Sequence, residues 1–213
     1  LAAVQLKFGR LLGDRNDAES VAVLRQSRQL FSQLNMTDDI RDKKIRLSSV
    51  TCCLVLAEHL DHSNIVEAEQ LYREAIRQCG AVTVSDDAMS RLQSTAQLRL
   101  GQLMVAQKRY AEALPNLNAF RERFAAAEGE SMSLPADRIA LVDCLIGLAT
   151  AEFALDHAMQ STRYLQRAER HLADRSTQSP AAGTAKDHSG MQRKHVESLK
   201  SMIFEKKRAD DQR

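Results

Sequence analysis

Hydrophobic residues recur every three or four positions along most of the chain, with polar residues between them. This is the period of an amphipathic helix that buries one face. The two clearest stripes are formed by Ile40, Leu47, Val50, Leu54 and Ala57 and by Met89, Leu92, Ala96, Leu100 and Leu103. Turn signals are rare, because the 213 residues include only three prolines and eight glycines. An all-β fold would need a turn about every 8–12 residues, so the pattern predicts an all-α protein.

Capping residues and prolines give the expected helix limits. Thr37, followed by two aspartates, predicts a helix start, since acids in the first turn are favoured by the helix dipole. Gly80 is expected to end a helix in the left-handed conformation. Pro135 is expected in the first turn of a helix, and Pro115 is expected to bend one slightly. Polar turns are expected at 61–64, 107–109 and 156–157.

An ordered set of small and large residues repeats four times along the chain. A small residue lies late in the first helix of each copy, at Gly9, Ala57, Gly101 and Ala149. The second helix opens with a small residue at Ser20, Ala68, Ala113 and Ser161, and these positions are 48, 45 and 48 residues apart. Large residues follow at Leu24, Tyr72, Leu117 and Leu165, with further small residues at Ala75 and Ala168 and an aromatic residue at Tyr110. Small residues allow close approach of two helices while the large residue fills the gap, so this set is predicted to pack the helix pairs.

The repeat predicts the domain organisation. Residues 1–174 are expected to form an α-solenoid of about four antiparallel helix pairs, because one pair cannot bury its apolar face alone. Residues 175–190 read as a linker. Residues 191–213 are predicted to form a charged C-terminal helix with Val196, Leu199, Met202 and Ile203 on one face. Its expected role is to cap the stack, with partner docking or phosphate binding as alternatives.

The segment RLGQLMVAQKRYAEALPNLNAF, residues 99–120, resembles the tetratricopeptide repeat superfamily. Residues 54–78 show the same order of residue types, and 145–171 and 6–31 follow it loosely. The consensus tryptophan and terminal proline are absent, and the period exceeds the usual 34 or so, as in long-period, kinesin-light-chain-like members. A HEAT or armadillo array and an irregular helical bundle remain alternatives.

The resemblance implies a concave face lined by the first helices, where a helix or an extended segment of a partner protein binds. The motif positions beside the first small residue carry polar side chains at Lys7, Arg10, Glu58, Arg99, Gln102 and Thr150. Chaperone-binding members use basic and Asn residues there to grip a terminal carboxylate. The corresponding row here is largely aliphatic (Leu6, Leu54, Leu98, Ile146), so that clamp is not expected.

The charge and the cysteines limit the chemistry. A net charge of +2, from 30 basic and 28 acidic residues, gives no general attraction to nucleic acid or to anionic membranes. No apolar run reaches the length of a membrane span. Cys52, Cys53, Cys79 and Cys144 lie within apolar helical patterns, as buried thiols do in a reducing compartment. The helical pattern is present from Leu1 without a cap, so we expect a processed form or an ordered region to begin there.

No catalytic or metal-binding constellation is predicted. His59 and His62 are three residues apart and could share a metal, but the zinc-protease spacing is absent and polar residues are usual at a helix end. Cys52 and Cys53 do not form a Cys-x-x-Cys redox pair, and core packing is the simpler interpretation. No phosphate-binding glycine loop or ordered catalytic triad is present, so no cofactor is expected.

The sequence therefore predicts a non-catalytic scaffold or adaptor that mediates protein–protein interactions within a larger assembly. By analogy with long-period arrays, we expect a cytoplasmic protein of the cytoskeletal, motor-cargo or ciliary kind. The alternative is an RNA-associated helical-repeat subunit of a ribonucleoprotein complex. That alternative needs a continuous basic stripe, which Lys7, Arg10 and Arg99 suggest and Glu58 interrupts.

Overall fold

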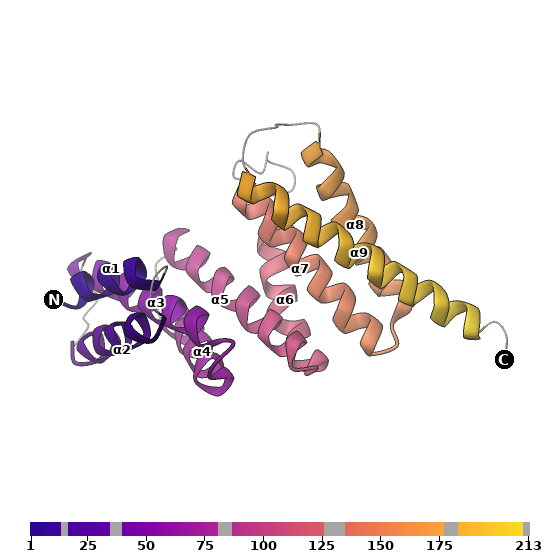
Figure 1. Cartoon of the computed structure of the whole chain (residues 1–213). Coiled ribbons are helices and arrows are strands. Elements are labelled where there is room, and N and C mark those ends of the chain that lie inside the picture. The colour runs from indigo at the N-terminus through magenta and orange to yellow at the C-terminus, as the bar shows by residue number, and fades with distance from the viewer. Residues whose placement is uncertain (14–16, 35–39, 81–86, 126–134, 177–182, 211–213) are drawn as a thin grey trace. The chain divides into compact units, whose positions relative to one another are not determined.

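The computed structural model describes residues 1–13, 17–34, 40–80, 87–125, 135–176 and 183–210. In these ranges there are nine helices and no strand, and Figure 1 labels the helices in chain order. Their bounds are α1 Ala2–Gly13, α2 Asp17–Ser32, α3 Ile40–Leu60, α4 Ile65–Gly80, α5 Asp87–Ala106, α6 Tyr110–Ala125, α7 Pro135–Ala154, α8 Ala158–Ser176 and α9 Gly183–Asp210. The predicted all-α array of four helix pairs and a C-terminal helix is confirmed.

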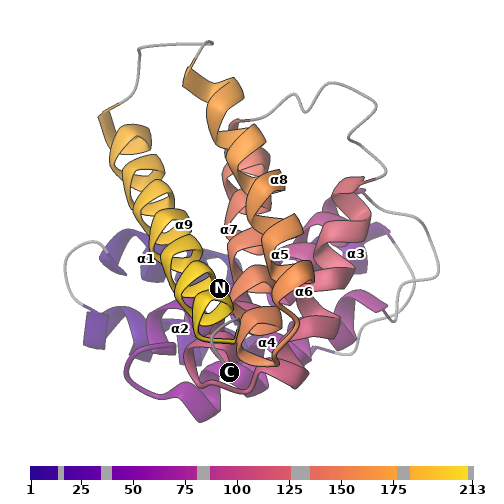
Figure 2. The ribbon, with the colours of Figure 1, turned by 90° about the vertical axis from the view of Figure 1, so that its right-hand side faces the viewer.

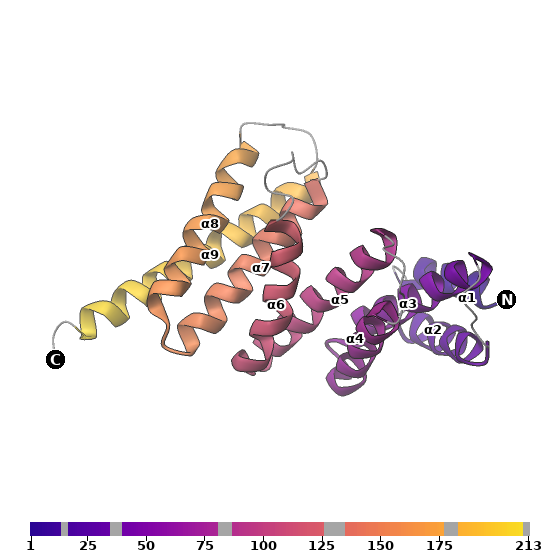
Figure 3. The same ribbon diagram turned by 180° about the vertical axis from the view of Figure 1, so that it is seen from behind.

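The chain forms two compact units, residues 1–103 and 104–213. In the first unit α1 packs on α2, α3 packs on both of these helices, and α4 packs on α3 (Figure 3). The core of this unit includes Leu24, Leu56, Leu71 and Tyr72, each at most 1% exposed. The first helix of the second pair therefore covers both helices of the first pair.

The second unit repeats this relationship. Helix α6 packs on α7, and α7 packs on α8. Helix α9 lies beside both α7 and α8, as Figure 2 shows. Its buried residues Gln192, Val196 and Leu199 follow the helical period on one face. Helix α9 therefore stands where the first helix of a further pair would stand.

Two turns between paired helices end in the left-handed conformation without glycine. Lys108 has φ 61° and Asp156 has φ 72°. After each residue the chain is closed by the same backbone hydrogen bond, from Arg109 N to the Met104 carbonyl (2.9 Å) and from His157 N to the Glu152 carbonyl (2.8 Å). This is the Schellman arrangement, which satisfies carbonyls left free at a helix end. The turns expected at 107–109 and 156–157 are confirmed.

Some expected helix limits differ from the structure. No glycine of the described residues has a positive φ, so the prediction of a left-handed cap at Gly80 is wrong; Gly80 is the last residue of α4. Helix α9 begins at Gly183 instead of near residue 191, so the expected linker is partly helical. Pro135 is the first residue of α7, as predicted, and Thr37 lies outside the described residues.

Two serine hydroxyls link the helices of their pairs at repeat-equivalent positions. Ser20 Oγ donates to the Gly9 carbonyl (2.6 Å), and Ser161 Oγ donates to the Ala149 carbonyl (2.8 Å). In each pair the bond joins the small residue of the second helix to that of the first. Both serines are fully buried, and an inter-helix bond from a small side chain requires the two backbones to be close.

Two thiols link one pair to the next in an equivalent way. Cys52 Sγ donates to the Leu24 carbonyl (3.4 Å), and Cys144 Sγ donates to the Leu117 carbonyl (3.2 Å). Leu24 and Leu117 are the large residues of their repeats, and both are 0% exposed. Each cysteine stands five positions before the small residue of its helix. Leu24 of α2 also adjoins α1, since a Cβ built on Gly9 would lie 2.8 Å from Leu24 Cγ, so Leu24 lies where three helices meet.

The residues predicted to pack the pairs are buried, apart from Tyr110, which is partly exposed. The buried members are Gly9, Ser20, Leu24, Ala57, Ala68, Tyr72, Ala75, Gly101, Ala113, Leu117, Ala149, Ser161, Leu165 and Ala168.

Candidate functional site

The polar residues predicted to bind a partner all lie on first helices. Lys7 and Arg10 are exposed on α1, and Glu58 is exposed on α3. Arg99 is exposed on α5, and Gln102 of the same helix is partly exposed. Thr150 on α7 is partly exposed, but its hydroxyl donates to the Ile146 carbonyl one turn earlier in its own helix (2.9 Å).

The structure brings three of these residues together. Arg99 Nε lies 3.3 Å from Glu58 Oε1, and an Arg99 guanidinium nitrogen lies 3.4 Å from Gln102 Oε1. The side chains of Arg99 and Glu58 remain 47% and 44% exposed. We call Glu58, Arg99 and Gln102 the polar cluster. A surface ion pair of this kind is weak. Glu58 and Arg99 can therefore give up their mutual contact and bind charged groups of a partner instead.

Tyr72 adds a buried hydroxyl beside the polar cluster. It is 1% exposed, and its hydroxyl has no hydrogen-bond partner among the described residues. Burial raises the pKa of Tyr72 above its ordinary value, the nearby carboxylates of Glu58 and Asp61 raise it further, and Arg99 acts in the opposite direction. The sequence placed Tyr72 only in the packing set. The available signal was that the other three repeats carry leucine at this position.

Lys7 and Arg10 are not part of the polar cluster. Across the part of the chain that the structure describes, neither residue forms an ion pair. They leave two positive charges on α1. The basic stripe needed for the RNA alternative therefore includes an arginine, Arg99, that is paired with a carboxylate.

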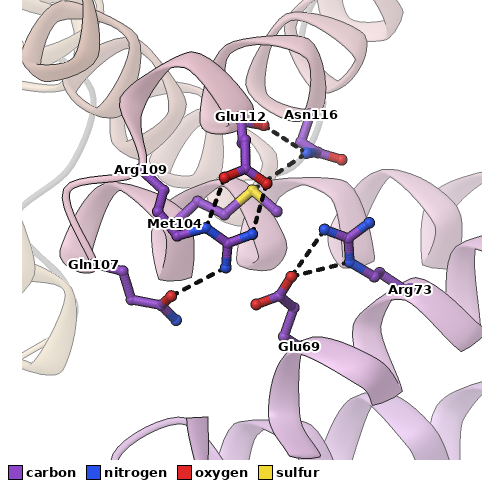
Figure 4. A network of polar contacts seen from close by, with 7 residues as sticks. All are labelled: Glu69, Arg73, Met104, Gln107, Arg109, Glu112 and Asn116. Carbon is purple, nitrogen blue, oxygen red and sulfur yellow. Dashed lines mark hydrogen bonds and ion pairs between the residues drawn. The ribbon is translucent and has the colours of Figure 1, made fainter. Parts of the chain in front are cut away.

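Further ion pairs stabilise the helices near these elements, as Figure 4 shows. In the turn between α5 and α6, Arg109 binds both carboxylate oxygens of Glu112 (2.6 and 2.8 Å) and the side-chain oxygen of Gln107 (3.1 Å). In α4, Arg73 binds Glu69 one turn away (2.8 Å). These bonds are local, within one helix or one turn: the Arg109 contacts lie at the start of α6, and the Arg73–Glu69 pair lies within α4.

The histidines near the end of α3 do not converge on a common point. His59 Nε2 lies 3.4 Å from Ser20 Oγ, whereas the exposed His62 lies 3.4 Å from its neighbour Asp61. Among the described residues, no group of three His, Cys, Asp or Glu side chains could hold a metal ion.

The cysteines are buried in packed helices. Burial raises the pKa of Cys53 and of Cys144 to about 12 and that of Cys79 to about 11. At neutral pH these groups are thiols rather than the nucleophilic thiolates. No helix in the described part of the chain is long and apolar enough to cross a membrane.

No protein-family model and no curated protein matches the chain. Solved structures do match it. One is of a kinesin light chain of Podosopora anserina with nearly identical tetratricopeptide-like repeats, at 15% identity and a TM-score of 0.59. A single-substitution variant of that protein gives 14% identity and a TM-score of 0.60. In both comparisons the match covers 99% of this chain and 96% of the other. The chain therefore has the tetratricopeptide-like helical-repeat fold.

Proposed function

We propose that the chain is a non-catalytic helical-repeat scaffold or adaptor that binds protein partners within a larger assembly. The observation that carries this proposal is the polar cluster. Its residues occupy repeat-equivalent positions next to the small residues Ala57 and Gly101, on two successive first helices. A repeat fold presents such positions as one continuous surface. The buried thiols and the separated histidines offer no competing reactive centre.

The partner that suits this surface is a helix or an extended segment carrying charges of both signs. The cluster offers a carboxylate and a guanidinium that are both partly exposed. Lys7 and Arg10 add positive charge on α1, and Gln102 adds an amide that can donate and accept hydrogen bonds. Recognition by such a row depends on matched charges more than on a deep pocket.

The proposal includes a cellular setting for the chain. The similar solved structures are of a kinesin light chain. This similarity supports a cytoplasmic assembly of the cytoskeletal, motor-cargo or ciliary kind as the place to look for partners. It rests on the fold alone, which many unrelated functions share.

The test is affinity purification of the chain and of an Arg99→Ala variant, with the bound proteins identified by mass spectrometry. The matched control is Arg91→Ala. Arg91 lies on the same helix and also forms an ion pair, with Asp87, and its side chain is 54% exposed against 47% for Arg99. We expect Arg99→Ala to lose a defined set of proteins that Arg91→Ala retains. Equal recovery by both variants would contradict binding at the polar cluster.

The same purification addresses the RNA alternative. Binding through phosphates weakens steeply with salt, because each contact releases counterions. Bound material that disappears after nuclease treatment, together with a steep salt dependence of binding, would favour an RNA-associated subunit. Protein partners that stay bound after nuclease treatment are the expected result.

A further inference from the structure

Helix α1 exposes an apolar stripe. Leu1 is 84% exposed, Val4 is 66% exposed and Phe8 is 50% exposed. These residues are three and four positions apart, so they lie on one side of the helix. The buried residues of α1, Leu6 and Gly9, lie on another side. We call Leu1, Val4 and Phe8 the α1 stripe.

The internal repeat allows the α1 stripe to be compared with the equivalent residues of the other first helices. Phe8 stands one position before the small residue of its helix. The residues at that position in the other three first helices are at most 2% exposed: Leu56, Leu100 and Leu148. Val4 stands five positions before the small residue, and its equivalents are all 0% exposed: Cys52, Ala96 and Cys144. The same positions are thus buried in every later copy and open in the first.

The contacts of the equivalent residues identify the kind of surface that covers them. Cys52 and Cys144 each donate a hydrogen bond to the carbonyl of the large residue in the preceding second helix, Leu24 or Leu117. Gly147, two positions before the small residue of α7, faces the same Leu117: a Cβ built on it would lie 3.2 Å from Leu117 Cδ1. The natural cover of this face is therefore a second helix with a large residue between small ones.

The apolar surface continues beyond the stripe. A hollow beside it lies at the start of α1, around the end of α2 and against α3. Its lining is apolar except for Gln33 and consists of Leu1, Ala2, Ala3, Leu30, Phe31, Gln33, Leu34 and Ile45. Leu34 is 45% exposed. An exposed apolar surface that joins several elements marks an interaction site more often than scattered apolar residues do.

A second copy of this chain has no free surface of the required kind in its described residues. The second helices α2, α6 and α8 are already covered by α3, α7 and α9. The apolar face of α4, formed by Ala68, Leu71, Tyr72 and Ala75, is at most 1% exposed. The described residues of this chain therefore supply no uncovered second helix of this kind.

We propose that the α1 stripe docks a tetratricopeptide-like helix pair of a partner protein and thereby extends the array. The contacting helix of the partner presents a small, a large and a small residue at spacings of four and three, with its outer face uncovered. Lys7, exposed one turn from Val4, favours an acidic residue beside that stripe. This surface is separate from the polar cluster, since it lies on α1 and contains none of the cluster residues.

The probe for this proposal is a designed consensus tetratricopeptide array of three repeats. The array ends in an uncovered second helix that carries a glutamate placed to reach Lys7. Binding of the fluorescently labelled probe to the whole chain is followed by anisotropy. We expect the wild-type protein to bind and Phe8→Glu to weaken binding by at least about tenfold, because it buries a charge in an apolar contact. Lys7→Ala should weaken binding less, because it removes only a charge at the edge of the contact.

The matched control is Met159→Glu, which changes another exposed apolar residue, 78% exposed on α8, and should leave binding unchanged. Phe8 is exposed, so its variant should keep the melting temperature of the wild type. Failure of the probe to bind, or equal binding by the Phe8 and Met159 variants, would overturn the proposal. Concentration-dependent self-association that is lost in Phe8→Glu would also overturn it, because the occupant would then be a second copy.

Discussion

The hydroxyl of Ser161 on α8 donates a 2.8 Å hydrogen bond to the backbone carbonyl of Ala149 on α7. The equivalent positions of two other pairs hold alanine, at Ala68 and Ala113, so the packing there tolerates loss of the hydroxyl. We expect Ser161→Ala to lower the free energy of unfolding by about 0.5–1.5 kcal/mol, the net value of one hydrogen bond. Urea denaturation followed by circular dichroism measures this change.

The size of residue 161 provides the control. Ser161→Val adds volume where the side chain is fully buried, so it should cost more than Ser161→Ala, about 1–3 kcal/mol. A valine variant as stable as the alanine variant would show that the two helices are not closely packed at this position.

A methyl group at Gly9 would collide with the core. A Cβ built there would lie 2.8 Å from Leu24 Cγ and 2.9 Å from Leu24 Cδ2, whereas a Cβ at Gly147 would lie 3.2 Å from the terminal Cδ1 of Leu117. Alanine favours a helix over glycine by about 1 kcal/mol. We expect Gly9→Ala to be destabilising by about 1–3 kcal/mol and Gly147→Ala to be nearly neutral. Thermal denaturation of both variants tests this order, and the reverse order would contradict the packing described for Leu24.

The sequence predicted these close approaches because they depend on residue size at a fixed spacing. It placed Gly9 and Ser20 in the packing set from the repeat alone. It missed the hydrogen bond between them, since a small residue can be selected for volume or for its hydroxyl and one sequence does not separate the two.

The prediction at Gly80 was wrong because it relied on residue type alone. Left-handed caps are usually glycine, yet the structure has Lys108 and Asp156 in this role, where the backbone hydrogen bonds of the turn hold them.

The pKa of Cys144 predicts a loss of stability at high pH. Burial raises it to about 12 from the ordinary value of 9.0. A group whose pKa is raised by folding stabilises the protein fully below its unfolded pKa and loses this effect as pH rises toward the folded pKa. The free energy of unfolding of wild type should therefore fall by about 1 kcal/mol more between about pH 8 and pH 10 than that of Cys144→Ala. Urea denaturation at the two pH values measures this, and equal slopes would contradict a buried thiol.

The ion pair between Arg25 and Glu67 predicts the opposite dependence at low pH. Arg25 binds both oxygens of Glu67 (2.5 and 3.1 Å) and lowers the pKa of Glu67 below its ordinary value of 4.5. This stabilisation is present above the ordinary pKa and is lost as pH falls through the lowered one. Because the Arg25 side chain is 49% exposed, we expect Arg25→Ala to cost less than about 1 kcal/mol at pH 7. The cost should shrink as pH falls through the lowered pKa of Glu67.

The comparison for this pair is Arg73→Ala, which removes a pair within one helix, between Arg73 and Glu69. Pairs one turn apart contribute about 0.3–0.5 kcal/mol. Denaturation of both variants at neutral and acidic pH would show whether the link between α2 and α4 is the stronger one. An acid-insensitive cost for Arg25→Ala would contradict an electrostatic origin.

The repeat places the residues of the polar cluster on the first helices but does not predict their contacts. The repeat offset selects Glu58, Arg99 and Gln102 because equivalent positions recur on every first helix. It does not reveal that Arg99 reaches Glu58 on a different helix, since side-chain reach depends on how two helices cross. The departure of Tyr72 from the leucine of the other repeats marks the position, but not that its hydroxyl lies beside the polar cluster.

The buried serine and cysteine hydrogen bonds between helices share a feature with an evolutionary consequence. The acceptors are backbone carbonyls, those of Gly9, Ala149, Leu24 and Leu117. Every residue type supplies a carbonyl, so mutation can change the acceptor residue without removing the acceptor. An array joined in this way can drift far in sequence while its helices keep their places. A chain that matches solved structures over 99% of its length at 14–15% identity is the outcome that such tolerance allows.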